Sequence, residues 1–134
     1  MLNDMPVRQI EDLTFGTGTA FVVDHHGGQR RFLPTLDPDD NGNIVEDVGF
    51  VSRTINPLNS SRTLTVCSGT RGRGVLGAAQ TLTDKRVRES NERYLRENFG
   101  DSYTFAIIMR VPVLGGKVIT PKFNTSGCVL YQWP

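Results

Sequence analysis

The sequence predicts an α/β or α+β domain: a small mixed sheet with a strand–glycine-loop–helix unit, two consecutive helices packed on the sheet, and flanking β-hairpins. Two observations lead to this prediction. A β-branched segment, residues 62–68, runs through a glycine-rich turn into a small-residue helix over 74–83. A perfectly alternating apolar strand over 103–113 follows a second helical stretch. We expect both strands to lie in one sheet, with the 74–83 helix between or beside them.

Size and composition indicate one domain. A chain of 134 residues suits a single core over residues 1–134, and its formal charge of +1 gives no global electrostatic case for nucleic acid or membrane binding. There is no apolar run near the roughly 20 residues of a membrane span and no signal-peptide pattern, so we expect a cytoplasmic protein. Two cysteines favour reduced thiols. The sequence is compatible with either an extended or a disordered state of residues 1–16. It is also compatible with the chain being a fragment of a longer regulator.

The N-terminal half is expected to contain a loose hairpin, a loop and a strand. Apolar and β-branched residues indicate the strands, and Asn56-Pro57 terminates the last one. A cluster of Pro, Asp, Asn and Gly indicates the loop. The predicted hairpin strands are 17–23 and 30–33, the loop is 34–46, and the following strand is 47–55.

The C-terminal half begins with the two helices. Asp84 is expected to cap a second helix of about 15 residues, which Gly100 ends. Arg and Glu residues spaced four apart indicate that one face of this helix is solvated. After the 103–113 strand, Gly115-Gly116 predicts a tight hairpin turn. The final residues, GCVLYQWP, are expected to form a last strand or a docked tail.

The glycine turn carries the main functional prediction. Residues 72–78 spell G-x-G-x-x-G-A, in which the first glycine permits a sharp turn, the second lets backbone N–H groups approach an anion, and the third lets the helix pack closely. The positive end of the helix dipole favours the same anion. Backbone N–H groups would give the geometry, two arginines the charge and two hydroxyls further hydrogen bonds. The predicted ligand-binding residues are Ser68, Thr70, Arg71, Gly72, Arg73 and Gly74.

The motif also has a purely structural interpretation, in which the glycines only serve a tight turn. NAD-linked hydride transfer is not expected, because no acidic residue ends a second strand about 20 residues further on. A phosphate or a nucleotide-like effector is the expected ligand, and no cofactor is predicted.

Three weaker patterns point to other chemistry. Residues 24–26 match the D-H-H signature of a phosphoesterase family, but the chain is too short to supply its further metal-binding aspartates. Residues 37–44 match the first half of a calcium loop, but Val48 stands where the bidentate Glu belongs. Cys67 lies beside the glycine turn, where no histidine can be placed as its base. We interpret these as a hairpin turn, a plain loop and a buried structural thiol, and we predict no metal site and no catalytic residue.

Residues 47–134 follow a longer pattern: D-x-G-L-I, N-P-x-N-x-x-R-T, G-x-x-G-x-G-x-x-G-A, L-T-D and a terminal Trp-Pro, with Phe50-Val51 in place of Leu-Ile. In this the chain resembles an uncharacterised C-terminal α/β (Rossmann-like) domain of bacterial, mainly actinobacterial, regulators and signalling proteins. The resemblance implies a regulatory or sensory partner domain and no catalytic residues.

Together these observations predict a small cytoplasmic sensor or regulatory domain that binds an anionic, nucleotide-like ligand at the glycine turn. One alternative is an enzyme acting on a nucleotide or a glycoside in the same pocket, with Cys67 or Asp47. Another is a protein-interaction or oligomerisation module with structural glycines. Expected partners are the anionic small molecule and either a second copy of the chain or a fused regulatory module, with no membrane and no direct nucleic acid contact.

Overall fold

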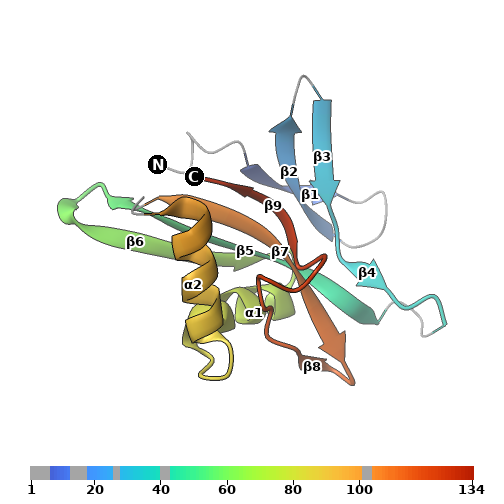
Figure 1. Cartoon of the computed structure of the whole chain (residues 1–134). Coiled ribbons are helices and arrows are strands. Elements are labelled where there is room, and N and C mark those ends of the chain that lie inside the picture. Colours follow the sequence, from blue (N-terminus) through green and yellow to red (C-terminus); the bar gives the residue numbers. More distant parts are fainter. Residues whose placement is uncertain (1–6, 13–17, 26–27, 40–42, 101–103) are drawn as a thin grey trace.

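The computed structural model describes residues 7–12, 18–25, 28–39, 43–100 and 104–134, and shows an α+β fold in three layers (Figure 1). Helices α1 (Gly72–Thr83) and α2 (Arg88–Phe99) cover one face of a larger sheet. A smaller sheet lies against its other face. The predicted combination of a sheet, two consecutive helices and flanking hairpins is confirmed.

The smaller sheet has the order β1 (Val7–Asp12), β2 (Gly18–His25), β3 (Gly28–Phe32) and is antiparallel. The predicted hairpin is confirmed as β2 and β3, although its turn at residues 26–27 lies outside the described residues. Strand β1 forms in the segment whose order the sequence left open. Residues 1–6 and 13–17 lie outside the described part of the chain.

The larger sheet is built on β5 (Ile44–Asn56), which pairs with β6 (Asn59–Gly69) on one side and β7 (Phe105–Leu114) on the other. The prediction that residues 62–68 and 103–113 lie in one sheet is therefore confirmed for β6 and β7, while residue 103 lies outside the described residues. Strand β9 (Val129–Trp133) extends the sheet beyond β7. Two short strands, β4 (Thr35–Leu36) and β8 (Lys117–Val118), pair with β5 and β7.

All the described strand pairs are antiparallel. In this the sheet differs from the mostly parallel Rossmann-like sheet that the resemblance implies. The prediction of a loop over residues 34–46 is wrong in part, because this segment contains β4 and the first residues of β5. Its Asp37 N–H donates to the Asn43 carbonyl at 2.8 Å, while residues 40–42 lie outside the description.

The central strands are buried on both faces, which explains their nearly continuous apolar sequence. On one face Val51 and Ile107 pack with the helix residues Ala78 and Leu95. On the other face residues of even number, such as Phe50, pack against the smaller sheet. The period of two along each strand thus assigns alternate residues to two separate cores.

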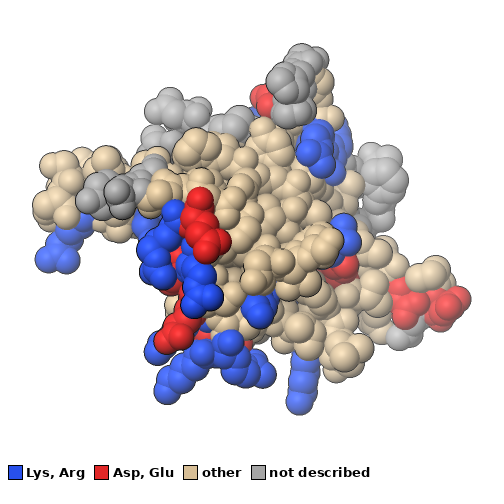
Figure 2. Space-filling view, in the orientation of Figure 1, with Lys and Arg blue, Asp and Glu red and all other residues tan. Residues whose placement is uncertain are grey.

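Helix α2 packs through Asn91 and Leu95 and exposes a charged face. Figure 2 shows Lys or Arg and Asp or Glu side chains intermingled over this helix. They line an open hollow of about 510 Å³ that extends to Leu82 of α1. Because the two signs of charge alternate there, the hollow offers neither an anion nor a cation a preferred site.

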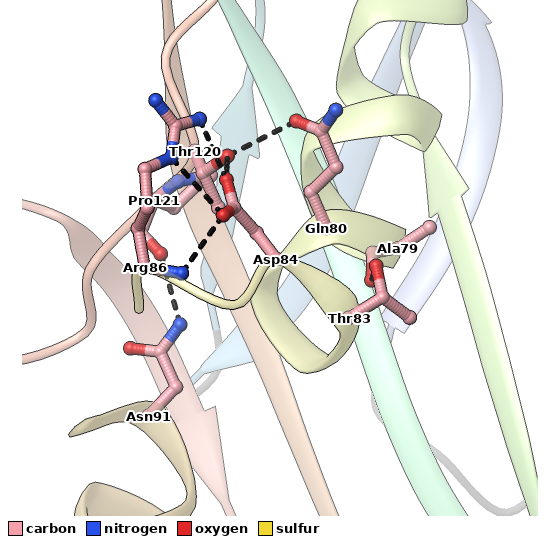
Figure 3. Close-up of polar contacts among 8 residues, drawn as sticks. All are labelled: Ala79, Gln80, Thr83, Asp84, Arg86, Asn91, Thr120 and Pro121. Atoms are coloured by element: carbon pink, nitrogen blue, oxygen red, sulfur yellow. Dashed lines mark hydrogen bonds and ion pairs between the residues drawn. The ribbon is translucent and has the colours of Figure 1, made fainter. Parts of the chain in front are cut away.

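The start of α2 corrects a sequence expectation, because the helix has 12 residues and begins at Arg88 rather than at Asp84. Asp84 instead organises the turn between the helices (Figure 3). Its carboxylate accepts hydrogen bonds from the Arg86 N–H at 3.0 Å and the Thr120 hydroxyl at 2.6 Å, and pairs with the Arg86 guanidinium at 2.9 Å. The side-chain hydrogen bond from Arg86, followed by that from Thr120, holds the pKa of Asp84 well below its usual range.

Asn91 fixes α2 to the segment that follows β8. Its amide donates to the carbonyls of Thr81 and Pro121, each at 3.0 Å, and its Oδ1 accepts from the Phe123 N–H at 2.9 Å. The side chain is fully buried. A buried amide with its donors and acceptor satisfied is a rigid connection, because leaving any of these groups unpaired is costly.

Candidate functional site

The glycine turn already holds a carboxylate of the chain itself. Asp47 of β5 is fully buried, and its Oδ2 accepts a hydrogen bond from the Gly74 N–H at 2.6 Å. Its Oδ1 accepts from the Thr70 hydroxyl at 2.6 Å and from the Val48 N–H at 2.8 Å. Gly74 lies in the first turn of α1, whose N–H groups lack partners within the helix. Asp47 therefore caps α1 from a neighbouring strand, at the position predicted for an external anion.

Close packing explains three of the glycines around this turn. A Cβ on Gly74 would lie 2.3 Å from the Val48 carbonyl oxygen, and one on Gly69 would lie 2.4 Å from the Val75 nitrogen. At Gly77 a Cβ would lie 2.5 Å from Cγ1 of Val111, so the predicted close packing of this glycine is confirmed.

Gly72 corrects the expectation of a sharp turn at the first glycine of the motif. It is already the first residue of α1, and its φ is not among the positive glycine values. A Cβ there would have no described heavy atom within 4 Å outside its own helix and chain neighbours. The turn is made by residues 70–71 instead, which connect the end of β6 to the helix.

The remaining predicted ligand-binding residues point in different directions. The Ser68 hydroxyl donates to Gln9 Oε1 at 3.1 Å, and Gln9 Nε2 donates to the Gly69 carbonyl at 3.1 Å, so this end of β6 is tied to β1. Arg73 donates through Nε to the Gly116 carbonyl at 3.3 Å. Arg71 and Arg73 are exposed. The structure thus brings the six residues into one turn but directs Thr70 and Gly74 inward, to Asp47.

Arg73 also lines a cavity of about 350 Å³ between the start of β5 and the β7–β8 turn. Asp37 and Asn43 line the same space, with Val45 and Val113 as apolar walls. The Asp37 carboxylate opposes binding of an anion beside Arg73, because like charges repel. This cavity therefore adds little to the predicted anion site.

A second cavity of about 350 Å³ lies beside the outer half of β7, and we call it the β7 cavity. Strand β9 pairs only with residues 106–109 of β7. Farther along, the segment 119–128 takes its place, with the Ile119 N–H donating to the Pro112 carbonyl at 2.9 Å and the Arg110 N–H to the Cys128 carbonyl at 2.8 Å. This irregular segment covers the strand less closely than a strand would, and the space beneath it is the cavity.

The walls of the β7 cavity are largely apolar. Two cationic side chains, Arg110 and Lys122, lie among its lining residues. Arg110 is half exposed and pairs through Nε with Glu46 Oε1 at 2.8 Å, and Lys122 is exposed. The hydroxyl-bearing residues Thr125 and Ser126 line the same space. The apolar walls are formed by Val87, Pro112, Ile119, Pro121 and Cys128.

The thiol in this cavity is not a nucleophile at neutral pH. Burial raises the pKa of Cys128 to about 11, against the smaller opposing effect of the Arg110 charge. A thiol with such a pKa stays protonated, and the thiolate is the reactive form. The Cys128 thiol therefore contributes an apolar wall to the cavity rather than a nucleophile.

No protein-family model, curated protein or solved structure matches this chain.

Two other sequence patterns can be placed in the structure. The Cys67 thiol is half-buried against the helix-side core rather than fully buried, and burial raises its pKa. Among the described residues, no three His, Cys, Asp or Glu side chains come together as a metal site. His26 and part of the calcium-like segment lie outside these residues. In the described chain, neither helix is long and apolar enough to cross a membrane.

The β7 cavity was missed by sequence reasoning because its cover has no periodic pattern. Residues 119–128, ITPKFNTSGC, follow a hairpin and precede β9 without apolar alternation. One signal was present: Arg110 interrupts an otherwise apolar strand. A charged residue in a strand that is buried on both faces indicates that the sheet is open to solvent at that point.

Proposed function

We propose that this chain is a small ligand-binding regulatory domain whose ligand has an apolar body and one anionic group and binds in the β7 cavity. The observation that carries this proposal is a concave space of about 350 Å³ with apolar walls and two cationic side chains. Ligand sites typically measure about 300–1,000 Å³ and combine apolar walls with a few polar groups. The size favours a small carboxylate or phosphate ester over a dinucleotide.

The cavity supports anion binding better than the glycine turn does. At the turn, the Gly74 N–H and the Thr70 hydroxyl both donate to Asp47. An incoming anion would have to displace a fully buried carboxylate. In the β7 cavity, Arg110 uses Nε for Glu46, and its Nη groups can bind a ligand carboxylate in a charge-assisted contact.

Two residues that line the cavity connect it to the turn between α1 and α2, which supports the proposed regulatory role. Thr120 lines the cavity and also donates its hydroxyl to Asp84 at 2.6 Å. Val87, another lining residue, is the N-cap of α2. A ligand in the cavity would therefore contact the groups that hold the turn between α1 and α2. A cytoplasmic location, where Cys67 and Cys128 stay reduced, belongs to the same proposal.

Isothermal titration calorimetry with a matched pair of probes tests this function. Phenylacetate carries the expected apolar body and anionic group, and phenylacetamide is its neutral counterpart. The parent protein should bind phenylacetate more tightly. Lys122→Met should weaken that binding about two- to five-fold, as expected for an exposed ion pair worth about 0.5–1 kcal/mol.

Lys117→Met is the matched control, because Lys117 is an exposed lysine on β8 that does not line the cavity. This variant should bind phenylacetate as the parent does. Equal affinity for the acid and the amide would contradict an anionic ligand group. Equal losses in the two lysine variants would contradict the location.

A further inference from the structure

Strand β6 lies at one edge of the larger sheet (Figure 1). It pairs with β5, and within the described residues no second strand pairs with it. Proteins usually protect such edges with short strands, lysines, prolines or bulges facing outward. β6 has 11 residues, with Arg62 as its one charged residue and no proline. Its regular part spans residues 63–69, and the Gly69 carbonyl at its end already accepts a hydrogen bond from Gln9. Among the described residues, the stretch 63–67 is therefore an unprotected edge, which we call the β6 edge.

Alternation along the strand identifies the backbone groups that point outward. The Thr70 N–H donates to the Val48 carbonyl at 3.0 Å, toward β5, whereas the Gly69 carbonyl accepts from the Gln9 side chain. In an antiparallel pair, successive residues direct their N–H and C=O groups to opposite sides. The groups of Thr63, Thr65 and Cys67 therefore point away from β5.

These three residues are self-complementary. If Thr65 lies opposite Thr65 of a second copy on a two-fold axis, then Thr63 lies opposite Cys67 of that copy, and Cys67 lies opposite its Thr63. Each of these pairs can exchange both backbone hydrogen bonds, because all three residues point outward. A two-fold interface requires this property, since the same surface serves both partners.

We propose that two copies of this chain dimerise through the β6 edge, antiparallel and centred on Thr65, to form one continuous sheet. The side chains fit this register. Leu64 lies opposite Val66 of the second copy, an apolar cross-strand pair that occurs twice about the axis. Arg62 lies opposite Ser68 of the second copy, so no like charges meet.

Exposed apolar residues also lie near this edge of the sheet. Ile55 is opposite Thr63 in β5, and is 48% exposed. In the proposed register Thr63 of the second copy lies beside Cys67, and Ile55 of that copy lies one strand farther away on the same face. Val75, 41% exposed in the first turn of α1, lies at that end of the strand. The hairpin tip adds Leu58, which is 95% exposed.

A charge-swap experiment tests the dimer. The mass of the parent, measured by light scattering during size-exclusion chromatography, should rise to that of a dimer with increasing protein concentration. Thr65→Lys and Thr65→Glu each place two like charges opposite each other on the axis and should weaken dimerisation by roughly tenfold or more. An equimolar mixture of the two variants should recover the dimer, which also shows that both variants are folded.

Thr35→Lys and Thr35→Glu are matched controls, because Thr35 is an exposed threonine on the short strand β4. They should dimerise as the parent does. Hydrogen exchange gives a second readout: the amides of Thr63, Thr65 and Cys67 should become protected as concentration rises, while those of Leu64 and Val66, which face β5, should not change.

A parent that stays monomeric at every concentration overturns the proposal. So does a Thr65→Lys variant that dimerises like the parent, or a mixture of the two Thr65 variants that remains monomeric.

Discussion

Replacing Gly77 by valine should destabilise the fold without any ligand. Even a Cβ at this position would lie 2.5 Å and 2.9 Å from the two γ-carbons of Val111, whereas carbon atoms normally approach to about 3.5–4.0 Å. Val111 is fully buried in β7 and β-branched, so its side chain has little freedom to turn away. The helix would have to move outward by about 1 Å to restore normal contact.

The size of this loss of stability follows from two opposing effects. Overpacking of a core typically costs about 1–3 kcal/mol, and the better helix propensity of valine over glycine returns only about 0.3 kcal/mol. We expect a net loss of about 1–3 kcal/mol in the free energy of unfolding. In urea, with a slope near 1–3 kcal/mol per molar, the midpoint should fall by roughly 1 M.

Gly72→Val is the matched control, because a Cβ there meets open space in the same helix. Its midpoint should stay close to that of the parent. Gly77→Val combined with Val111→Ala should lose less stability than the sum of the two single variants, since the smaller residue makes room for the larger. An unchanged midpoint for Gly77→Val would refute the close packing of α1 on Val111 of β7.

Four further outcomes are expected. Asn91→Asp should lower stability by about 1–3 kcal/mol in thermal or urea unfolding, because a carboxylate cannot donate to the two buried carbonyls. The pKa of Asp84 is lowered in the fold, so stability should fall as pH drops below about 4, its unfolded value, and Asp84→Asn should reduce that fall. The pKa of the Cys128 thiol is raised to about 11 in the fold. The free energy of unfolding should therefore fall as pH rises from about 8.5, the value in the unfolded chain, toward 11, and Cys128→Ala should reduce that fall in unfolding titrations. If the glycine turn binds an anion, the double variant Arg71→Ala, Arg73→Ala should abolish binding of inorganic phosphate in calorimetry without changing the melting temperature, and equal phosphate binding by parent and variant would place the site elsewhere.

Local patterns allowed much of the fold to be predicted. The alternation through Phe105, Ile107 and Met109 identified β7, and Gly115-Gly116 identified the β7–β8 turn, where both residues have positive φ, at 57° and 79°. Gly77 could be assigned to close packing because it is the third glycine of the G-x-G-x-x-G pattern, which lets the helix pack closely on the sheet. These features depend on neighbours in the sequence, which a single sequence reveals.

Features that depend on distant residues could not be predicted in the same way. The carboxylate that caps α1 comes from Asp47, 27 residues before Gly74, and no local spacing indicates such a contact. Asp84 has the composition of a helix cap but bonds Thr120, 36 residues away. The β7 cavity depends on an irregular segment, so it has no periodic signature.

The proposed ligand site is tested most directly by mapping where a small carboxylate binds. Phenylacetate is titrated into ¹⁵N-labelled protein, and the amide chemical shifts are followed. We expect saturable shifts concentrated at residues 110–112 and 119–128, which Lys122→Met reduces and Lys117→Met leaves unchanged. Saturable shifts confined to residues 68–74, or no saturable shift at the β7 cavity, would contradict it.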